Sequence, residues 1–159
     1  MTAAFALLLM ATPKIIHLSP NGSDEGLGTK SKPFFSLVRA VKDSLPGDTI
    51  LLADGVYRFK LPQKITFKGR SDAWLAIKAA KDAKPILDFD GFRPKSLGEA
   101  ADGGSINLVK AEYIRFEGIT VRNSYQFGFR AAEGCQWLDL VNCASHGSFG
   151  PGIGIWNSS

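Results

Sequence analysis

Short runs of alternating apolar and polar residues fill the last third of the chain, and the alternation repeats. Residues 113–122 (YIRFEGITVR) match residues 137–146 (WLDLVNCASH) at a shift of 24. The shift places Leu138 on Ile114, Leu140 on Phe116 and Cys143 on Ile119. Because a period of two is typical of β-strands, the pattern predicts short strands that recur about every two dozen residues.

A further strand recurs within each repeat. FGFR (127–130) falls on INLV (106–109) at a shift of 21, and IGIW (153–156) falls on FGFR at a shift of 26. Such a repeat, without a regular helix, predicts a β-solenoid in which equivalent strands stack in parallel about 4.8 Å apart. This register predicts two inward columns: Ile106, Phe127 and Ile153 in one, and Leu108, Phe129 and Ile155 in the other.

The first half of the chain predicts one helix among further strands. Leu37, Val38, Val41 and Leu45 recur at helical spacing, which predicts a helix over 36–45 that Pro46 and Gly47 end. This helix precedes the regular strands, where a solenoid needs its open apolar end covered. Strands are expected at residues 15–18, 49–55, 56–59, 64–69, 73–79 and 85–91, and loops at 20–33 and 93–104.

The alternative architecture is a β-sandwich, which requires hairpins with tight turns between neighbouring strands. We see no such turns between the repeated strands, so the solenoid is favoured. The last strand, GIGIW, reads as a coil strand in the middle of a stack, and the three residues after Trp156 are too few for a terminal cap. We therefore expect the stack to be incomplete at the C-terminus and the chain to be the N-terminal part of a longer protein.

The segment LSPNGSDEGLGTKSKPFFSLVRAVKDSLPGDTILLADGVYRF resembles the N-terminal region of right-handed parallel β-helix proteins of the pectate-lyase-like superfamily. The resemblance covers about Ile16 to Phe59, and ITVRNS and GIGIWNSS resemble the coil repeats of the same group. It implies an all-β fold, a right-handed parallel β-helix with an N-terminal capping α-helix, over residues 14–159. It also implies a secreted or periplasmic, carbohydrate-directed protein, but this fold hosts lyases, hydrolases, epimerases and non-catalytic binders.

The net charge indicates which kind of partner the protein can bind, and the N-terminal residues indicate where the protein is located. The formal net charge is +4, from 19 basic and 15 acidic residues, which suits an acidic partner such as a polyuronate. Nucleic acid is disfavoured because no cluster of Lys and Arg is interleaved with aromatic residues. The apolar run Ala3–Ala11 is too short to span a bilayer, and residues 1–13 read as the remnant of a secretory signal, or else as a first strand or helix.

Few acidic residues are placed for catalysis or metal binding. Elimination from a polyuronate needs the sugar carboxylate neutralised by Ca²⁺ or by Arg or Lys, and a base to take the neighbouring proton. Asp139 falls opposite Arg115, so the two are expected to pair across the strands. Asp88 with Asp90, and Asp24 with Glu25, suit turns better than a calcium site, so Ca²⁺ has no convincing site here. Cys135 and Cys143 are expected to be free thiols, and no spacing suggests zinc.

Four residues are candidates for substrate binding. Arg130 and Trp156 are equivalent at the shift of 26, and an outward Arg beside an outward Trp would suit a sugar stacked on the indole with its carboxylate on the guanidinium. Arg122 and His146 are equivalent at the shift of 24, where a strand runs into a turn. For both pairs the simpler alternative is that they are ordinary exposed coil residues.

The leading hypothesis is a secreted, pectate-lyase-like protein that acts on an acidic polysaccharide by β-elimination, monomeric at full length, with its catalytic coils beyond this segment. The alternative is a non-catalytic carbohydrate-binding or cell-surface structural β-helix. A glycoside hydrolase on the same fold would need two or three outward carboxylates on adjacent coils, and the segment shows no such set.

Overall fold

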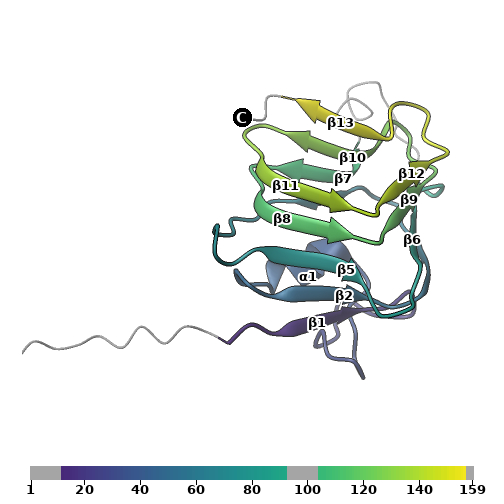
Figure 1. The fold of residues 1–159 in the computed structure, drawn as a ribbon. Helices are drawn as coiled ribbons and strands as arrows, with labels where there is room; N and C mark the ends of the chain where they lie inside the picture. The colour runs from purple at the N-terminus through teal and green to yellow at the C-terminus, as the bar shows by residue number, and fades with distance from the viewer. Residues whose placement is uncertain (1–11, 93–103, 157–159) are drawn as a thin grey trace, which may run out of the picture.

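The computed structural model describes residues 12–92 and 104–156, which form a stack of coils with three parallel sheets (Figure 1). Sheet A contains, in order, β1 (Ile15–Leu18), β2 (Thr49–Leu52), β5 (Leu75–Ala79), β8 (Glu112–Glu117) and β11 (Gln136–Val141). Sheet B contains β3 (Gly55–Arg58), β6 (Pro85–Asp88), β9 (Thr120–Arg122) and β12 (Ala144–His146). Sheet C contains β4 (Gln63–Ile65), β7 (Gly104–Val109), β10 (Phe127–Ala132) and β13 (Ile153–Trp156).

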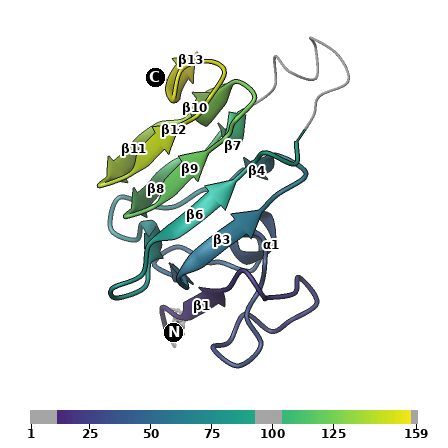
Figure 2. The ribbon, with the colours of Figure 1, turned by 90° about the vertical axis from the view of Figure 1, so that its right-hand side faces the viewer.

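The chain visits the three sheets in turn, so each full coil adds one strand to each sheet. Every pairing between the named strands is parallel. Figure 2 shows this stacking on sheet B, where β3, β6, β9 and β12 follow one another along the axis. The predicted parallel β-helix is therefore confirmed, and the sandwich alternative, which requires hairpins, is wrong.

The core lies inside the coils and consists of columns of apolar side chains. Ile50 pairs with Ile77, Ile77 with Phe116, and Phe116 with Leu140 along sheet A. The first three are fully buried, and Leu140 packs against the same cluster. Each such side chain contributes about 1.5–3 kcal/mol by leaving water, so the columns hold successive coils in register.

The register of sheet C differs from the predicted one by two residues. Phe129, not Phe127, pairs with Ile106 on one side and Ile153 on the other, at shifts of 23 and 24. Ala131 occupies the next column, between Leu108 and Ile155. Phe127 pairs with Gly104 and lies outside the core cluster. The similarity of FGFR to IGIW predicts the wrong register, because the small residue Ala131 lies between Leu108 and Ile155, where Phe129 was expected.

The turns between strands recur with the same backbone geometry from coil to coil. In the later coils, residues with a positive φ recur in the turns and at the second residue of β8 and β11; for residues other than glycine this conformation costs free energy and persists only where the surrounding structure holds it. Pairs of such residues, one coil apart, are Gly118 and Asn142, Asn123 and Gly147, Lys110 and Glu133, and Tyr113 and Trp137. The coil repeat is therefore a property of the turns as well as of the strands.

The one helix of the described residues, α1 (Leu37–Lys42), is shorter than the predicted range 36–45. Ser36 caps its start, with the Oγ accepting from the Arg39 amide at 3.1 Å. Leu37, Ala40 and Val41 are buried, whereas Val38 and Leu45 are 41% and 51% exposed, so the predicted apolar face is wrong in those two positions. The helix packs against β1 and β4 at the N-terminal end of the stack (Figure 1).

The remaining expectations concern the ends and loops. The loop at 20–33 contains no strand or helix, and the two cysteines are free, as expected. The loop at 93–104 and the segment 1–13 lie almost entirely outside the described residues.

Ile153 and Ile155 extend the inward columns of sheet C, yet they are 53% and 69% exposed. Within the described residues, no helix is long and apolar enough to cross a membrane.

Candidate functional site

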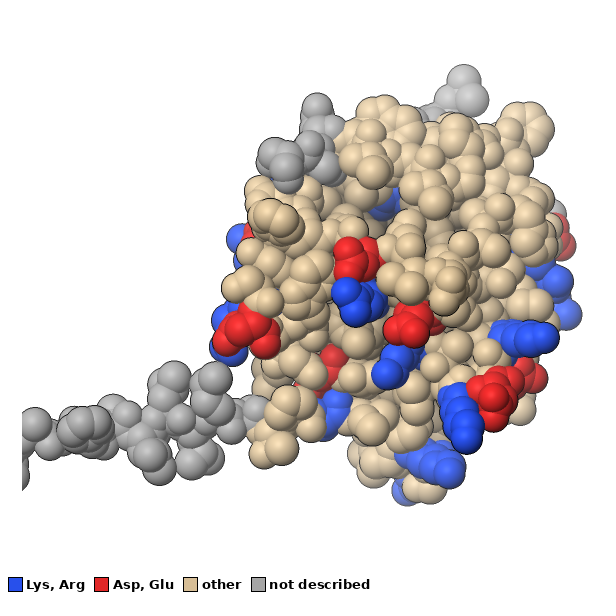
Figure 3. Space-filling model, viewed as in Figure 1, with Lys and Arg blue, Asp and Glu red and all other residues tan. Residues whose placement is uncertain are grey.

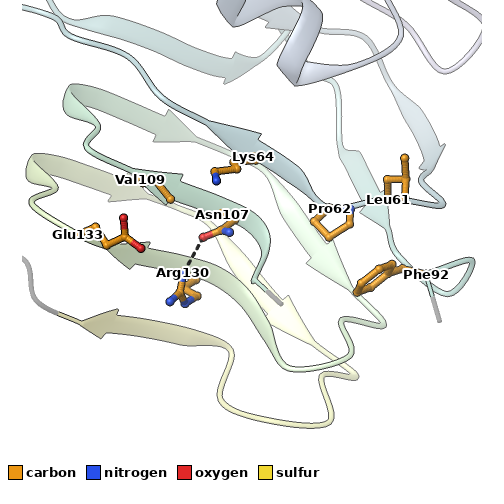
Figure 4. Close-up of a pocket in the computed structure, with 8 residues that line it drawn as sticks. All are labelled: Leu61, Pro62, Lys64, Phe92, Asn107, Val109, Arg130 and Glu133. Carbon is orange, nitrogen blue, oxygen red and sulfur yellow. Dashed lines mark hydrogen bonds between the residues drawn. The ribbon is translucent and has the colours of Figure 1, made fainter. Parts of the chain in front are cut away.

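The outer face of sheet C carries a concave pocket of about 460 Å³, shown in Figure 4. It crosses β4, β7 and β10, so three successive coils contribute to it. The lining residues are Leu61, Pro62, Lys64, Phe92, Asn107, Val109, Arg130 and Glu133. Of the residues predicted to bind substrate, Arg130 lies in this pocket.

A row of three polar side chains forms the centre of the pocket. Lys64 pairs with Asn107 in the strand register, and Asn107 pairs with Arg130. Because neighbouring strands lie about 4.8 Å apart, the strands carrying Lys64 and Arg130 are separated by about 10 Å. The Arg130 Nη1 donates to the Asn107 Oδ1 at 3.0 Å. These residues alternate with the inward Ile65, Leu108 and Ala131, and this alternation directs them outward.

Within residues 12–92 and 104–156, no acidic side chain forms an ion pair with the cations of this row. The Arg130 guanidinium is held by a neutral amide, and Lys64 makes no ion pair with the rest of the described chain. Among the described residues of the lining, Glu133 is the single acidic one, against two cations. A carboxylate-bearing ligand could therefore accept charge-assisted hydrogen bonds from both ends of the row.

The other side of the pocket is apolar. Leu61, Pro62 and Phe92 lie together on the side away from Glu133 (Figure 4). Phe92 is buried, whereas Leu61 is exposed. One wall thus suits the carbon face of a sugar ring, while the centre suits its carboxylate.

A second pocket of about 590 Å³ lies beside the first, between α1 and the segment that leads into β4. The two pockets share Leu61, Pro62 and Lys64. Phe35, Val38 and Phe59 contribute apolar surface to the second pocket, and Lys60 adds a further cation. Sequence patterns did not reveal this pocket, because its residues come from the helix N-terminus and from a loop.

The pocket residues do not fit calcium. Ca²⁺ takes six to eight oxygen ligands and favours several carboxylates, whereas the described part of this lining contains one carboxylate beside two cations. Among the described residues, no group of three or more His, Cys, Asp or Glu side chains is close enough to hold a metal ion. The Asp24 Oδ1 accepts from the amides of Phe35 and Ser36, so this carboxylate holds its loop onto the helix.

Arg122 and His146 lie on a different face, sheet B, and are neighbours as predicted. Arg122 also faces Asp88, whose Oδ2 accepts from the Arg122 Nε at 3.0 Å and Nη2 at 2.8 Å. Arg58 approaches the same oxygen at 3.4 Å from the coil below. Arg122 therefore forms an ion pair within the protein, and His146, like Arg58, is exposed.

Asp88 is only 3% exposed, yet it is held in the charged form. Burial alone would raise its pKa. Hydrogen bonds from the Asn123 side chain, the Asp90 amide and Arg122, together with the charge of Arg122, more than offset this effect and hold the pKa below its usual range. The expected turn at Asp88 and Asp90 is present, with the Asp90 amide donating to the Asp88 Oδ1 at 3.1 Å.

The predicted equivalence of Arg130 and Trp156 is wrong, because of the same two-residue shift in sheet C. Arg130 pairs with Gly154, and Trp156 pairs with Ala132. The Trp156 indole nevertheless folds back over Gly154, where a Cβ would collide with it. The ring also contacts Phe127 edge-on, with centroids 4.6 Å apart. Trp156 is partly exposed and does not line the pocket that contains Arg130.

The outside of sheet A carries a row of aromatic rings that the sequence analysis missed. Tyr113 and Trp137 stack with centroids 6.0 Å apart and planes 9° apart, and Trp74 meets Tyr113 edge-on at 5.6 Å. The predicted pair of Arg115 and Asp139 is confirmed beside this row, at 2.6 Å. The signal was present, since the shift of 24 also places Trp137 on Tyr113. Figure 3 shows this face as largely uncharged, with blue and red groups in contact.

Comparison with known proteins gives concordant results. The family model described as "Pel9A-like, right handed beta helix region" matches residues 16–159. The chain is 30% identical over 142 residues to "Pectate lyase PEL9" of Emericella nidulans, a match that covers 72% of this chain and 35% of that protein. The chain thus spans about a third of the length of this curated relative.

Two solved structures share the fold at low sequence identity. The crystal structure of pectate lyase Pel9A has a TM-score of 0.68 and 22% identity, covering 91% of this chain and 36% of that one. A rhamnogalacturonan lyase has a TM-score of 0.67 and 18% identity, covering 89% of this chain and 37% of that one. In both matches, this chain covers little more than a third of the solved structure.

Proposed function

The chain belongs to the Pel9A-like right-handed β-helix family, and from this premise we propose that it forms substrate-binding coils of a polysaccharide lyase that acts on an acidic polysaccharide. The observation that carries the proposal is the row of Lys64, Asn107 and Arg130 in the sheet C pocket. The names of the relatives, a pectate lyase and a rhamnogalacturonan lyase, agree with a substrate that contains uronate units.

The chemistry of β-elimination explains why such a row is useful. A base removes the proton on the carbon next to the carboxylate, the electron pair forms a carbon–carbon double bond, and the glycosidic oxygen leaves. The developing negative charge spreads onto the carboxylate, so cations that bind this group stabilise the transition state. Lys64 and Arg130 can supply that charge to bound uronates, and Asn107 keeps the guanidinium of Arg130 directed across the pocket.

The proposal extends to the location of the protein and its state of assembly. The apolar run Ala3–Ala11 supports export, so the protein is proposed to be secreted or periplasmic. Its partner is then a polymer outside the cytoplasm, and a monomer is proposed at full length. These statements share one test, which is the location and mass of the native protein in culture fractions.

A non-catalytic carbohydrate-binding role is the second candidate, and one observation favours it. Exposed aromatic rings lie on the outside of the coils, with Trp137 stacked on Tyr113 and Phe149 stacked on Tyr125. Such rings can bind the apolar faces of sugars without any chemistry. The two candidates differ in one measurement on the full-length protein, because a lyase releases unsaturated products that absorb ultraviolet light and a binder does not.

Binding of polygalacturonate by the full chain tests the main proposal. Lys64→Ala and Arg130→Ala should each weaken binding about ten-fold, because each removes one charge-assisted contact to a carboxylate. Lys81→Ala is the matched control, since Lys81 is an exposed lysine in a turn that lines neither pocket. If all three variants bind as tightly as the wild type, the sheet C pocket is not the uronate site.

A further inference from the structure

The second pocket differs in chemistry from the first, although the two are joined at Leu61, Pro62 and Lys64. Phe35 packs on Phe59 with ring centroids 5.1 Å apart, and Val38, Leu61 and Pro62 complete an apolar surface. Leu61 and Val38 are 68% and 41% exposed. Single exposed apolar residues are normal on a protein surface, but several that share one concavity suggest a binding site.

A buried side-chain amide holds the backbone that carries two of these apolar side chains. The Gln63 Oε1 accepts from the Val38 amide at 3.4 Å, and the Gln63 Nε2 donates to the Leu61 carbonyl at 3.3 Å. Gln63 thus ties the start of α1 to the loop before β4 and holds both walls of the pocket. A pocket held in place in this way loses little conformational entropy when a ligand enters.

The charge at the edge of the pocket shows how a ligand would continue into the first pocket. Lys60 and Lys64 are exposed, and Lys64 belongs to both linings. The row from α1 through Lys64 to Arg130 runs across the strands, along the axis of the coils (Figure 4). A polymer of linked sugars with its carboxylates on Lys64 and Arg130 would place its next unit against Leu61 and Val38.

We infer that the second pocket is a subsite for a methyl-bearing sugar unit next to a free uronate. The shared chemistry is a methyl group that is buried against Phe35, Val38 and Leu61, with a carboxylate of the neighbouring unit on Lys64. The methyl group can come from a methyl-esterified uronate or from a 6-deoxyhexose. This inference rests on the proposed function, because it assumes that the first pocket binds uronate.

The test compares three acidic oligosaccharides of equal length, by calorimetric titration of the full chain. One is a homouronate, one carries methyl esters on alternate units, and one alternates uronate with a 6-deoxyhexose. The double variant Val38→Ser, Leu61→Ser should lower the affinity for a methyl-bearing oligomer relative to the homouronate about four-fold, the effect of one buried methyl group. A fall for one oligomer alone identifies the source of the methyl group.

Two controls separate this inference from the proposed function. Leu27→Ser changes a leucine that is 69% exposed, in a loop that lines neither pocket, and should leave the ratio of affinities unchanged. Lys64→Ala should weaken all three oligomers without changing the ratio by much. A ratio that the double variant does not change, with homouronate binding intact, overturns the apolar subsite alone. Failure of the wild type to bind homouronate overturns the proposed function as well.

Discussion

Replacement of Asp88 tests whether the ion pair on sheet B holds three coils together. The carboxylate accepts two hydrogen bonds from Arg122, one from Asn123 at 2.9 Å and one from the Asp90 amide. A hydrogen bond to a charged group contributes about 1.5–3 kcal/mol, and a neutral one about half of that. Asp88→Ala removes all of them, but Arg122 is partly exposed and can regain water. We therefore expect a loss of about 3 kcal/mol of unfolding free energy.

The loss is measured by thermal and urea unfolding of the full chain, followed by circular dichroism. A loss of this size should lower the melting temperature by about 6–12 °C in a chain of this length. Arg58→Ala is the matched control, because Arg58 is well exposed and lies 3.4 Å from the same oxygen, so its loss should cost less than about 1 kcal/mol. If Asp88→Ala and Arg58→Ala unfold at the same temperature, the Asp88 carboxylate does not hold the coils together.

The same residue predicts a dependence on pH. The pKa of Asp88 is lower in the folded protein than in the unfolded chain, where it is about 3.9. The charged carboxylate therefore contributes stability above about pH 4, and that contribution is lost as the pH falls through the lower folded value. Asp88→Asn should flatten the acid limb of the stability curve relative to the wild type. An unchanged acid limb would mean that other carboxylates dominate the acid response.

Two further substitutions test the cap and the register. Val41→Asp places a charge in the buried face of α1 and should cost about 3 kcal/mol, with a lower melting temperature in the same assay; no change would show that the helix is peripheral. Gly128→Ala places a Cβ in collision with the Ser145 Oγ and should cost about 1–3 kcal/mol. A variant as stable as the wild type would contradict the close packing of β10 against β12.

The sequence predicts the fold well because the inward columns must be apolar in every coil. It predicts the repeat less well, because the coils differ in length. From Ile50 to Ile77 the chain uses 27 residues, from Ile77 to Phe116 it uses 39, and from Phe116 to Leu140 it uses 24. Only the last of these intervals matches the shift that the pattern revealed. Longer connections between sheets hide the earlier repeats from any fixed shift.

The candidate site was predicted only in part. Arg130 was identified from its position on a repeated strand, but its neighbours Lys64 and Asn107 come from coils with other spacings. Nothing in a single sequence shows that residues 23 and 43 positions apart share one column. Arg122 was singled out for its place at the end of a strand, and its main partner, Asp88, lies 34 residues away across the coil stack. Partners of this kind are set by the register between strands of successive coils. That register depends on the lengths of the turns, which the sequence pattern does not give.

The row of Lys64, Asn107 and Arg130 also affects how the protein unfolds. Each of the three residues belongs to a different coil, and each coil contacts only its neighbours, so the coils can lose structure separately. A polymer bound along the row would contact three coils at once, so these coils would unfold together. Ligand binding would then protect the amide hydrogens of β4, β7 and β10 together from exchange. The bound polymer would thus stabilise the three coils against local unfolding.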